Sequence, residues 1–294
     1  MRNPFHIPYQ LLYHPWFADA QVQLGVLRLD QMEGIVRGNK WFKLLHVFED
    51  VQKNEKRGII TYGGAYSNHI YATAMACNHL GLKSVGIIRG EETLPLNPVL
   101  AAAKAQGMYL HYINRATYRQ KHVSEIKEQW LALYPDFYEI PEGGANHQAV
   151  TGCSLIPTYV PVPFDYIVCA CGTGSTLAGL ITGIAPAQTA IGISVLKGGD
   201  FLREAVRQFV LPIRQENLPV WEIQTSYHFG GYAKQSSELS AFVQFCKTTW
   251  NLPVEPVYTA KMFFGLCDLI RKGYFPKGSH IAAVHTGGLV PLYD

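Results

Sequence analysis

The sequence of 294 residues is poor in charge: only 16% of its residues are Asp, Glu, Lys or Arg, against 48% hydrophobic residues. The 25 Lys and Arg and the 22 Asp and Glu give a formal net charge of +3 and are interspersed, without long runs of one sign. Proteins that bind nucleic acid usually concentrate basic residues in a patch or a stripe. The sequence therefore predicts no nucleic-acid partner, and its apolar content excludes a disordered chain.

Long apolar runs and targeting signals are also missing. No stretch approaches the roughly 18 uninterrupted apolar residues of a transmembrane helix, so we expect no membrane segment. The opening residues, MRNPFHIPYQLLYHPWF, lack the basic start, apolar run and cleavage site of a secretory signal. A cytoplasmic location is the resulting expectation.

The six cysteines lack the paired C-x-x-C spacing of zinc sites and redox motifs. They lie in apolar surroundings, so we expect buried free thiols and no metal site. Cys169 and Cys171 are two residues apart in an alternating run, YIVCACG, and should therefore face the same side of a strand.

Short runs rich in β-branched residues alternate along the chain with segments whose apolar residues recur every three or four positions. This alternation predicts an α/β fold with parallel sheet, in one or two packed lobes, because no linker or repeat interrupts the chain. Strands are expected at residues 22–29, 58–62, 84–90, 109–113, 166–172, 191–196, 220–224 and 281–285. Helices are expected at 41–53, 68–80, 97–106, 118–133, 175–184, 201–210, 235–249 and 260–272.

The segment CGTGSTLAG (171–179) follows an expected strand and opens an Ala/Leu-rich helix. Its glycines allow a tight turn, its hydroxyl residues are donors, and a helix N-terminus attracts anions, so the segment predicts a phosphate site. The alternative is a plain strand-to-helix turn in which Ser175 caps the helix. A dinucleotide fingerprint is not present, because its third glycine would fall at Leu177.

Two further segments combine a loop with the start of a helix. In TYGGAYSNHIYATAMA (61–76), Ser67 and Asn68 could bind a small carboxylate or merely cap the helix. In RGNKWFKLL (37–45), Lys40 falls on the first turn of a helix, where the helix dipole and burial lower the pKa of a lysine and make its amine a nucleophile. A solvated surface lysine is the alternative.

Taken together and in this order, the three segments resemble motifs of the 1-aminocyclopropane-1-carboxylate (ACC) deaminase and D-cysteine desulfhydrase family of pyridoxal 5'-phosphate (PLP) enzymes. GNKWFKL is similar to the family's GNK-x-R-K-L motif, with Phe42 in place of the arginine, which implies that Lys40 is catalytic and forms the Schiff base with PLP. GGAYSNH is similar to its GG-I-Q-S-N loop, which implies a catalytic hydroxyl at Ser67 and a cofactor or substrate contact at Asn68. The substrate contacts implied by this loop are Tyr66, Ser67, Asn68 and His69.

Other motifs extend the resemblance from about residue 20 to the C-terminus. IPEGGANH (140–147) is similar to the family's segment in which the chain returns from one lobe to the other. GGY and EPVYTAK match its catalytic tyrosine motifs at Tyr232 and Tyr258. HTGG (285–288) is similar to its last active-site loop. PLP contacts are implied at Lys40, Asn68, Gly172, Thr173, Gly174, Ser175, Thr176 and Thr259. Two departures are that Tyr66 stands where the family usually has Gln, and that only about 20 residues precede the first expected strand.

The resemblance also implies an architecture. The fold would be the tryptophan-synthase-β type, PLP fold type II: α/β, with two open, twisted, mostly parallel sheets flanked by helices. Residues 1–50 and 148–294 would form a large PLP-binding domain, and residues 51–147 a small inserted domain. The expected partners are a small amino-acid substrate and a second copy of the chain in a homodimer.

Thr259 and Thr286 bear on the choice of reaction. Deaminases of the family have Glu and Leu at these positions, and desulfhydrases resemble this chain. A hydroxyl can hydrogen-bond a neutral pyridine nitrogen but does not stabilise a pyridinium as a carboxylate does, so we expect β-elimination of the D-cysteine desulfhydrase kind, giving a keto acid and ammonia. Thr286 would then be a substrate-side contact.

Three alternatives to this reaction stay open. ACC deamination is one, and a protein that binds PLP or an amino acid without turnover is another. A dinucleotide-dependent oxidoreductase is disfavoured by Leu177 and by the missing acid about 20 residues beyond the loop.

Overall fold

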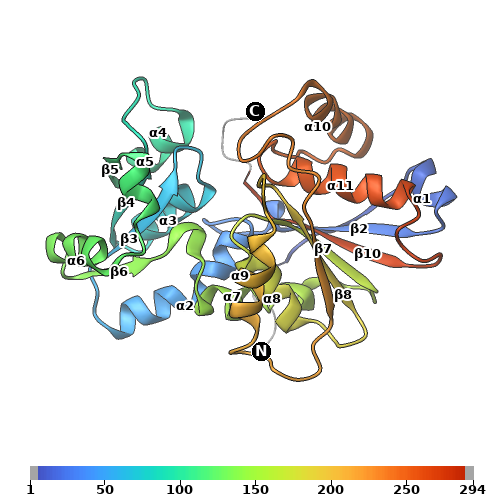
Figure 1. The fold of residues 1–294 in the computed structure, drawn as a ribbon, viewed down its shortest axis with the longest axis horizontal. Helices are drawn as coiled ribbons and strands as arrows, with labels where there is room; N and C mark the ends of the chain where they lie inside the picture. The colour runs from blue at the N-terminus through green and yellow to red at the C-terminus, as the bar shows by residue number, and fades with distance from the viewer. Residues whose placement is uncertain (1–5, 289–294) are drawn as a thin grey trace.

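The computed structural model describes residues 6–288, which form two sheets with helices on both faces of each (Figure 1). The larger sheet has six strands in the order β1-β2-β10-β7-β8-β9, and the smaller has four in the order β5-β4-β3-β6. All neighbouring strands are parallel except β1 and β2. The expected α/β fold with two open, mostly parallel sheets is confirmed.

The larger sheet is built from both ends of the chain. Its strands are β1 (Tyr9–Leu12), β2 (Gln23–Arg28), β7 (Tyr166–Cys171), β8 (Thr189–Ser194), β9 (Val220–Gln224) and β10 (His280–His285). One face is covered by α1 (Pro15–Asp19), α10 (Ser237–Trp250) and α11 (Thr259–Arg271), and the other by α7 (His147–Cys153), α8 (Ser175–Gly183) and α9 (Phe201–Val210). Central strands such as β7 are buried on both faces, which is why they are almost wholly apolar. Cys169 and Cys171 lie in the same core cluster, on one face, as predicted.

The smaller sheet repeats the three-layer arrangement. Its strands are β3 (Gly58–Gly64), β4 (Lys83–Arg89), β5 (Tyr109–Ile113) and β6 (Phe137–Ile140). Helices α3 (Asn68–His79) and α4 (Pro98–Ala105) pack on one face, and α5 (Arg115–Arg119) and α6 (Ser124–Leu133) on the other. Asparagine and serine side chains cap several of these helices; Asn97, for example, accepts hydrogen bonds from the N–H groups of Val99 and Leu100.

Helix α2 (Asn39–Lys53) connects the two sheets. Its Phe42 belongs to the core of the larger sheet, whereas Leu44, Val47 and Val51 belong to the core of the smaller one. The strands of the smaller sheet occupy residues 58–140, between the segments that supply the larger sheet. Because α2 packs against both, the domain boundaries at residues 50/51 and 147/148 stay a prediction. No helix within residues 6–288 is long and apolar enough to cross a membrane.

Short elements account for the differences from the expected pattern. The first strand is β1, so fewer residues precede it than expected; its four residues, YQLL, form an antiparallel edge that is only partly buried and shows no clear alternation. The edge strand β6 and the helix α7 were not expected either. The single helix expected at 118–133 is two helices, α5 and α6, separated by a turn at residues 120–123. Elements as short as β1, β6, α5 and α7 carry too few residues for a periodic signal.

Candidate active site

A cavity of about 1170 Å³ opens where the carboxyl ends of strands from both sheets meet. The end of β4 and the loops after β3, β6, β7 and β10 all supply wall residues, which is the usual location of ligand sites in open α/β sheets. The predicted site residues that line it are Lys40, Ser67, Asn68, His69, Gly172, Thr173, Gly174, Thr176, Tyr232, Tyr258 and Thr286. Three predicted residues do not line it: Tyr66, whose side chain is 48% exposed, and the buried Ser175 and Thr259.

Lys40 lies on the first turn of α2, at the wall of the cavity. The chain reaches it through Gly38, which has a φ of 82° and touches the segment after β10: a Cβ at Gly38 would come 2.3 Å from the carbonyl oxygen of Thr286. Lys40 Nζ donates a hydrogen bond to Asn39 Oδ1 at 3.0 Å. Burial, reinforced by the charge of Lys43, lowers the pKa of Lys40 to about 7. About half of these amines are therefore neutral at pH 7.

Two polar residues of α2 face the same site but were not assigned a role from the sequence. Asn39 Nδ2 donates to Thr176 Oγ1 at 2.8 Å, which ties the start of α2 to the start of α8. Lys43 Nζ donates to the carbonyl oxygen of Gly143 at 2.9 Å, and burial lowers the pKa of Lys43. Asn39 and Lys43 are four residues apart and thus share one helix face, which is the signal that would have found them.

The segment after β7 forms the predicted strand-to-helix turn. Gly174 has a φ of 86° and caps α8, and a Cβ there would come 2.8 Å from Val206 Cγ2, so the position requires glycine. A Cβ at Gly172 would come 3.0 Å from Tyr258 Cε1. The backbone N–H groups of the first turn of α8 have no partner within the helix and can bind an anion. Ser175 is fully buried beside Thr173, with 3.4 Å between the hydroxyl oxygens.

Ser67 and His69 are both held by local hydrogen bonds. Ser67 caps α3, because its Oγ accepts from the N–H of Ile70 at 3.3 Å, and it also lines the cavity. His69 Nε2 lies 2.9 Å from Thr61 Oγ1, whose proton is donated to the carbonyl oxygen of Ile140. Nε2 must therefore carry the proton of the neutral ring. Burial, together with the charges of Lys40 and Lys43, holds the pKa of His69 well below its ordinary value.

The two predicted catalytic tyrosines lie together at the cavity wall. The ring centroids of Tyr232 and Tyr258 are 5.9 Å apart, and burial raises the pKa of both hydroxyls. Tyr232 donates a weak hydrogen bond, 3.4 Å long, to the carbonyl oxygen of Tyr66, which lies in the loop after β3 of the smaller sheet. The loop before Tyr232 is anchored by the fully buried Lys261, whose Nζ donates to Gly231 O at 2.7 Å and whose pKa is lowered to about 8 by burial.

Thr259 is engaged by a carboxylate that the sequence reasoning missed. The carboxylate of Glu255 accepts hydrogen bonds from the backbone N–H groups of Val257, Tyr258 and Thr259, at 2.7 to 2.8 Å, and so caps α11. The Thr259 hydroxyl accepts from Glu255 N at 2.9 Å and lies 3.2 Å from Glu255 Oε1. Burial raises the pKa of Glu255, while the N–H groups oppose that rise. The hydroxyl of Thr259 is thus directed to Glu255, whereas Thr286 lines the cavity.

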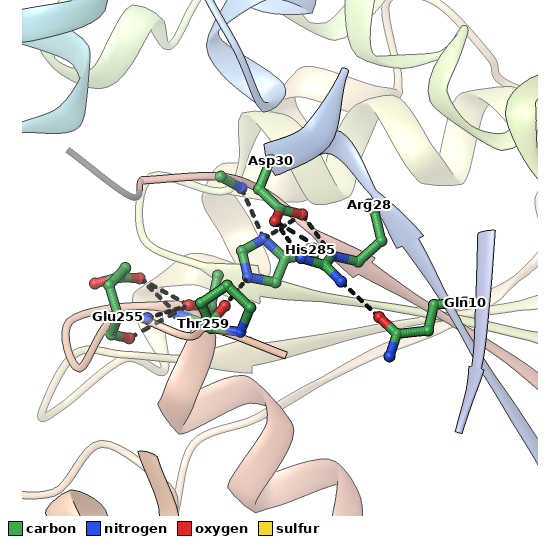
Figure 2. Close-up of polar contacts among 8 residues, drawn as sticks. Gln10, Arg28, Asp30, Glu255, Thr259 and His285 are labelled. Atoms are coloured by element: carbon green, nitrogen blue, oxygen red, sulfur yellow. Dashed lines mark hydrogen bonds and ion pairs between the residues drawn. The ribbon is translucent and has the colours of Figure 1, made fainter. Parts of the chain in front are cut away.

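A second buried polar cluster is formed by Gln10, Arg28, Asp30 and His285, the residue before Thr286 (Figure 2). Arg28, at the end of β2, binds Asp30 through Nε and Nη2, the latter at 2.6 Å, and donates from Nη1 to Gln10 at 2.5 Å. His285, at the end of β10, places Nδ1 3.2 Å from Asp30 Oδ1. The register of the sheet sets His285 beside Arg28, so residues far apart in sequence meet here.

His285 connects three segments around the cavity. Its Nε2 donates to the carbonyl oxygen of Pro253 at 2.8 Å, near the loop that leads to Glu255. Nδ1 also lies 3.3 Å from the N–H of Gly287, from which the neutral ring accepts a hydrogen bond. Burial lowers the pKa of His285, although Asp30 opposes this, which favours the neutral ring.

Comparison with known proteins accords with this geometry. The model of the family described as pyridoxal-phosphate dependent enzymes matches residues 11–287. The chain belongs to this family. A Pyrococcus horikoshii protein, named as a candidate 1-aminocyclopropane-1-carboxylate deaminase, is 32% identical over 279 residues, which are 90% of this chain and 84% of the relative.

Other relatives of this PLP enzyme have related names. The mitochondrial bifunctional D-cysteine desulfhydrase/1-aminocyclopropane-1-carboxylate deaminase of Arabidopsis thaliana is 30% identical over 295 residues, covering 91% of this chain and 73% of that one. A crystal structure described as an ACC deaminase homologue matches with a TM-score of 0.85 and 29% identity, over 99% of this chain and 91% of the other. The family predicted from the motifs is confirmed, and with it PLP fold type II.

The cofactor of this enzyme is PLP, and the residues present fit it. An aldehyde requires a neutral amine, which Lys40 offers because its pKa is about 7. A phosphate requires converging donors without side chains in the way, which the turn at Gly172 and Gly174 and the first turn of α8 offer. When bound, PLP supplies an electron sink for bonds at the amino-acid α-carbon.

Proposed function

We propose that this PLP enzyme releases a keto acid and ammonia from a small β-substituted amino acid, as a D-cysteine desulfhydrase does. Lys40 would carry the cofactor, and residues 172–176 with the first turn of α8 would hold its phosphate. Ser67 and Asn68, at the N-terminus of α3, would bind the substrate carboxylate, which the N–H groups of that helix end favour. The support for these roles is that all of these residues except the buried Ser175 line one cavity.

The observation that carries the choice of reaction concerns the carboxylates of the cavity. Of the described residues, only Asp30 and Glu142 line it with a carboxylate. Asp30 is bound by Arg28, and Glu142 lies 3.1 Å from Lys121 Nζ. Neither is free to pair with a protonated pyridine nitrogen. A ring nitrogen without a carboxylate partner would make a weaker electron sink, which suits β-elimination better than opening of the ACC ring.

The chain's own groups can perform the proton transfers. The neutral amine of Lys40 is a base of suitable pKa to remove the α-proton. Ser67 is the second candidate, but its Oγ already accepts a hydrogen bond from Ile70. The hydroxyls of Tyr232 and Tyr258 have raised pKa values, so they remain protonated at neutral pH and can donate to the departing β-substituent. The enamine that is released hydrolyses in water to the keto acid and ammonia.

The test is keto-acid release from D-cysteine, L-cysteine, D-serine and ACC by the PLP-loaded enzyme. We expect kcat/KM for D-cysteine to exceed that for ACC at least tenfold, which requires only about 1.4 kcal/mol of differential stabilisation of the transition state. A preference for ACC would contradict the proposal. Retained PLP without turnover of any of the four would instead favour a binding protein.

Variants at Thr286 test whether the hydroxyl of this predicted substrate contact directs the choice of reaction. Thr286→Leu should reduce the preference for D-cysteine, whereas Thr286→Ser keeps a hydroxyl and should preserve it. Thr259→Glu is less informative, because it would place a second buried carboxylate beside Glu255. Equal effects of Leu and Ser at position 286 would show that the hydroxyl does not direct the reaction.

A further inference from the structure

Arg89 is a cavity-lining residue that the proposed reaction does not use. It ends β4 and pairs in register with Gly64 at the end of β3, three residues before Ser67. A Cβ at Gly64 would come 3.2 Å from Arg89 Nη2, so the guanidinium lies over the glycine that begins the Ser67 loop. Its central carbon is 5.8 Å from the ring centroid of Tyr232 and 5.7 Å from that of Tyr118. Two aromatic rings therefore hold an exposed guanidinium at the rim of the cavity.

The positive charge of Arg89 has no carboxylate partner within residues 6–288. Both carboxylates that line the cavity are used elsewhere, Asp30 by Arg28 and Glu142 by Lys121. The ring of Tyr118, near which the guanidinium lies, is also contacted by the ammonium of Lys121, 4.7 Å from the ring centroid. This end of the cavity thus holds one more cation than the protein neutralises.

We propose that Arg89 binds a second anionic group, carried on the substrate side chain, so that the enzyme prefers amino acids with acidic β-substituents over neutral ones of the same size. The inference rests on the proposed function and names its substrate class. The α-carboxylate has its own donors at the N-terminus of α3, at Ser67 and Asn68. Arg89 lies beyond them, next to Tyr232, which is the proposed proton donor to the departing β-substituent.

A guanidinium suits this task because its planar donors can bind both oxygens of a carboxylate or a phosphate. The rings of Tyr118 and Tyr232 restrict its position, which reduces the ordering cost of binding. Because the rim is exposed to water, the gain is moderate, and about a tenfold effect on kcat/KM is expected for one charge-assisted contact.

Two substrates that differ by one charge test the proposal: S-carboxymethylcysteine and S-carbamoylmethylcysteine, each as both enantiomers. In each, the α-C–H and β-C–S bonds break and the thiolate leaves with the electron pair; hydrolysis of the enamine gives pyruvate and ammonia. Arg89→Gln should lower kcat/KM for the carboxymethyl compound at least tenfold and leave the carbamoylmethyl compound within about twofold, with Arg89→Lys intermediate. Arg119→Gln, an exposed arginine that does not line the cavity, should change neither. Equal losses for both compounds in Arg89→Gln, or no loss, would overturn the proposal.

A binding measurement separates failure of this inference from failure of the proposed function. 2-Methylaspartate and 2-methylasparagine have no α-proton to lose, and their binding can be followed by the absorption of the bound cofactor. The wild type should bind 2-methylaspartate at least tenfold more tightly than 2-methylasparagine, and Arg89→Gln should abolish this difference in affinity. This result would support Arg89 even if no keto acid is released from any substrate, in which case only the proposed reaction fails. Equal affinities in the wild type would refute the role of Arg89.

Discussion

Asp30→Asn is expected to be the most damaging isosteric substitution in the described chain. The carboxylate of Asp30 accepts two close hydrogen bonds from Arg28, at 2.9 Å and 2.6 Å, and lies 3.2 Å from His285 Nδ1. The side chains of Arg28 and Asp30 are only 3% and 2% exposed, so water cannot replace the lost charge. The amide would leave the guanidinium buried without a counter-charge.

The magnitude follows from that burial. Removing one partner of a buried ion pair costs about 3–5 kcal/mol, because the remaining charge keeps its desolvation penalty. An exposed carboxylate is worth far less, and Asp19→Asn on the surface should stay within about 0.5 kcal/mol of wild type. The comparison of these two Asp→Asn changes isolates the effect of the buried pair.

Urea denaturation followed by circular dichroism measures both variants, with PLP removed so that cofactor binding does not add to stability. Arg28→Met combined with Asp30→Leu should cost less than the sum of the two single changes, because no charge is left unpaired. If Asp30→Asn costs no more than Asp19→Asn, or if the double change is additive, the pair does not act as a buried charge pair. Borohydride labelling of Lys40 in Asp30→Asn would show whether the start of α2 is disturbed as well.

Three other predictions concern the cofactor. Borohydride reduction of the holoenzyme should attach PLP to Lys40, and peptide mass spectrometry that finds the label on another lysine would contradict the assignment. The rate of PLP capture should rise with pH through about 7, because the lowered pKa of Lys40 makes its amine neutral above that pH; a rate at pH 6 roughly tenfold below the plateau at pH 8 is expected, and a midpoint near 10 would refute it. Gly174→Ala should weaken PLP retention through its contact with Val206, whereas Gly198→Ala, also at positive φ but with open space around it, should not; equal retention on dialysis would show that the turn at Gly174 does not hold the phosphate.

The fold was predictable where periodic signals are long. Buried strands such as β7 and amphipathic helices such as α9 stand out because their burial patterns repeat over several residues. The four-residue edges β1 and β6 carry no such repetition. Their pairing is decided by the neighbouring strand, a long-range contact that the local sequence does not encode.

The candidate site was predictable where chemistry depends on one segment. Lys40, the loop at 172–176 and Ser67 each stand in a local motif, and the structure brings them to one cavity. The alternative role of Ser67 as a cap is also realised. By contrast, the contact between Asp30 and His285 requires the register of β2 with β10, and the direction of Thr259 depends on a carboxylate one turn upstream. Tyr66 stands in the motif but its side chain lies on the surface, because the loop turns it outward.

The position of β10 has a consequence for how the protein is made. β10 lies between β2 and β7, although it is synthesised after every other strand of the described chain. Until it leaves the ribosome, the facing edges of β2 and β7 have unpaired backbone groups, which invite association with other chains. Gly287, just beyond β10, packs against Gly38, where a Cβ would come 2.9 Å from the Gly38 Cα. The segment that leads to Lys40 therefore gains its final support only when translation has passed this point.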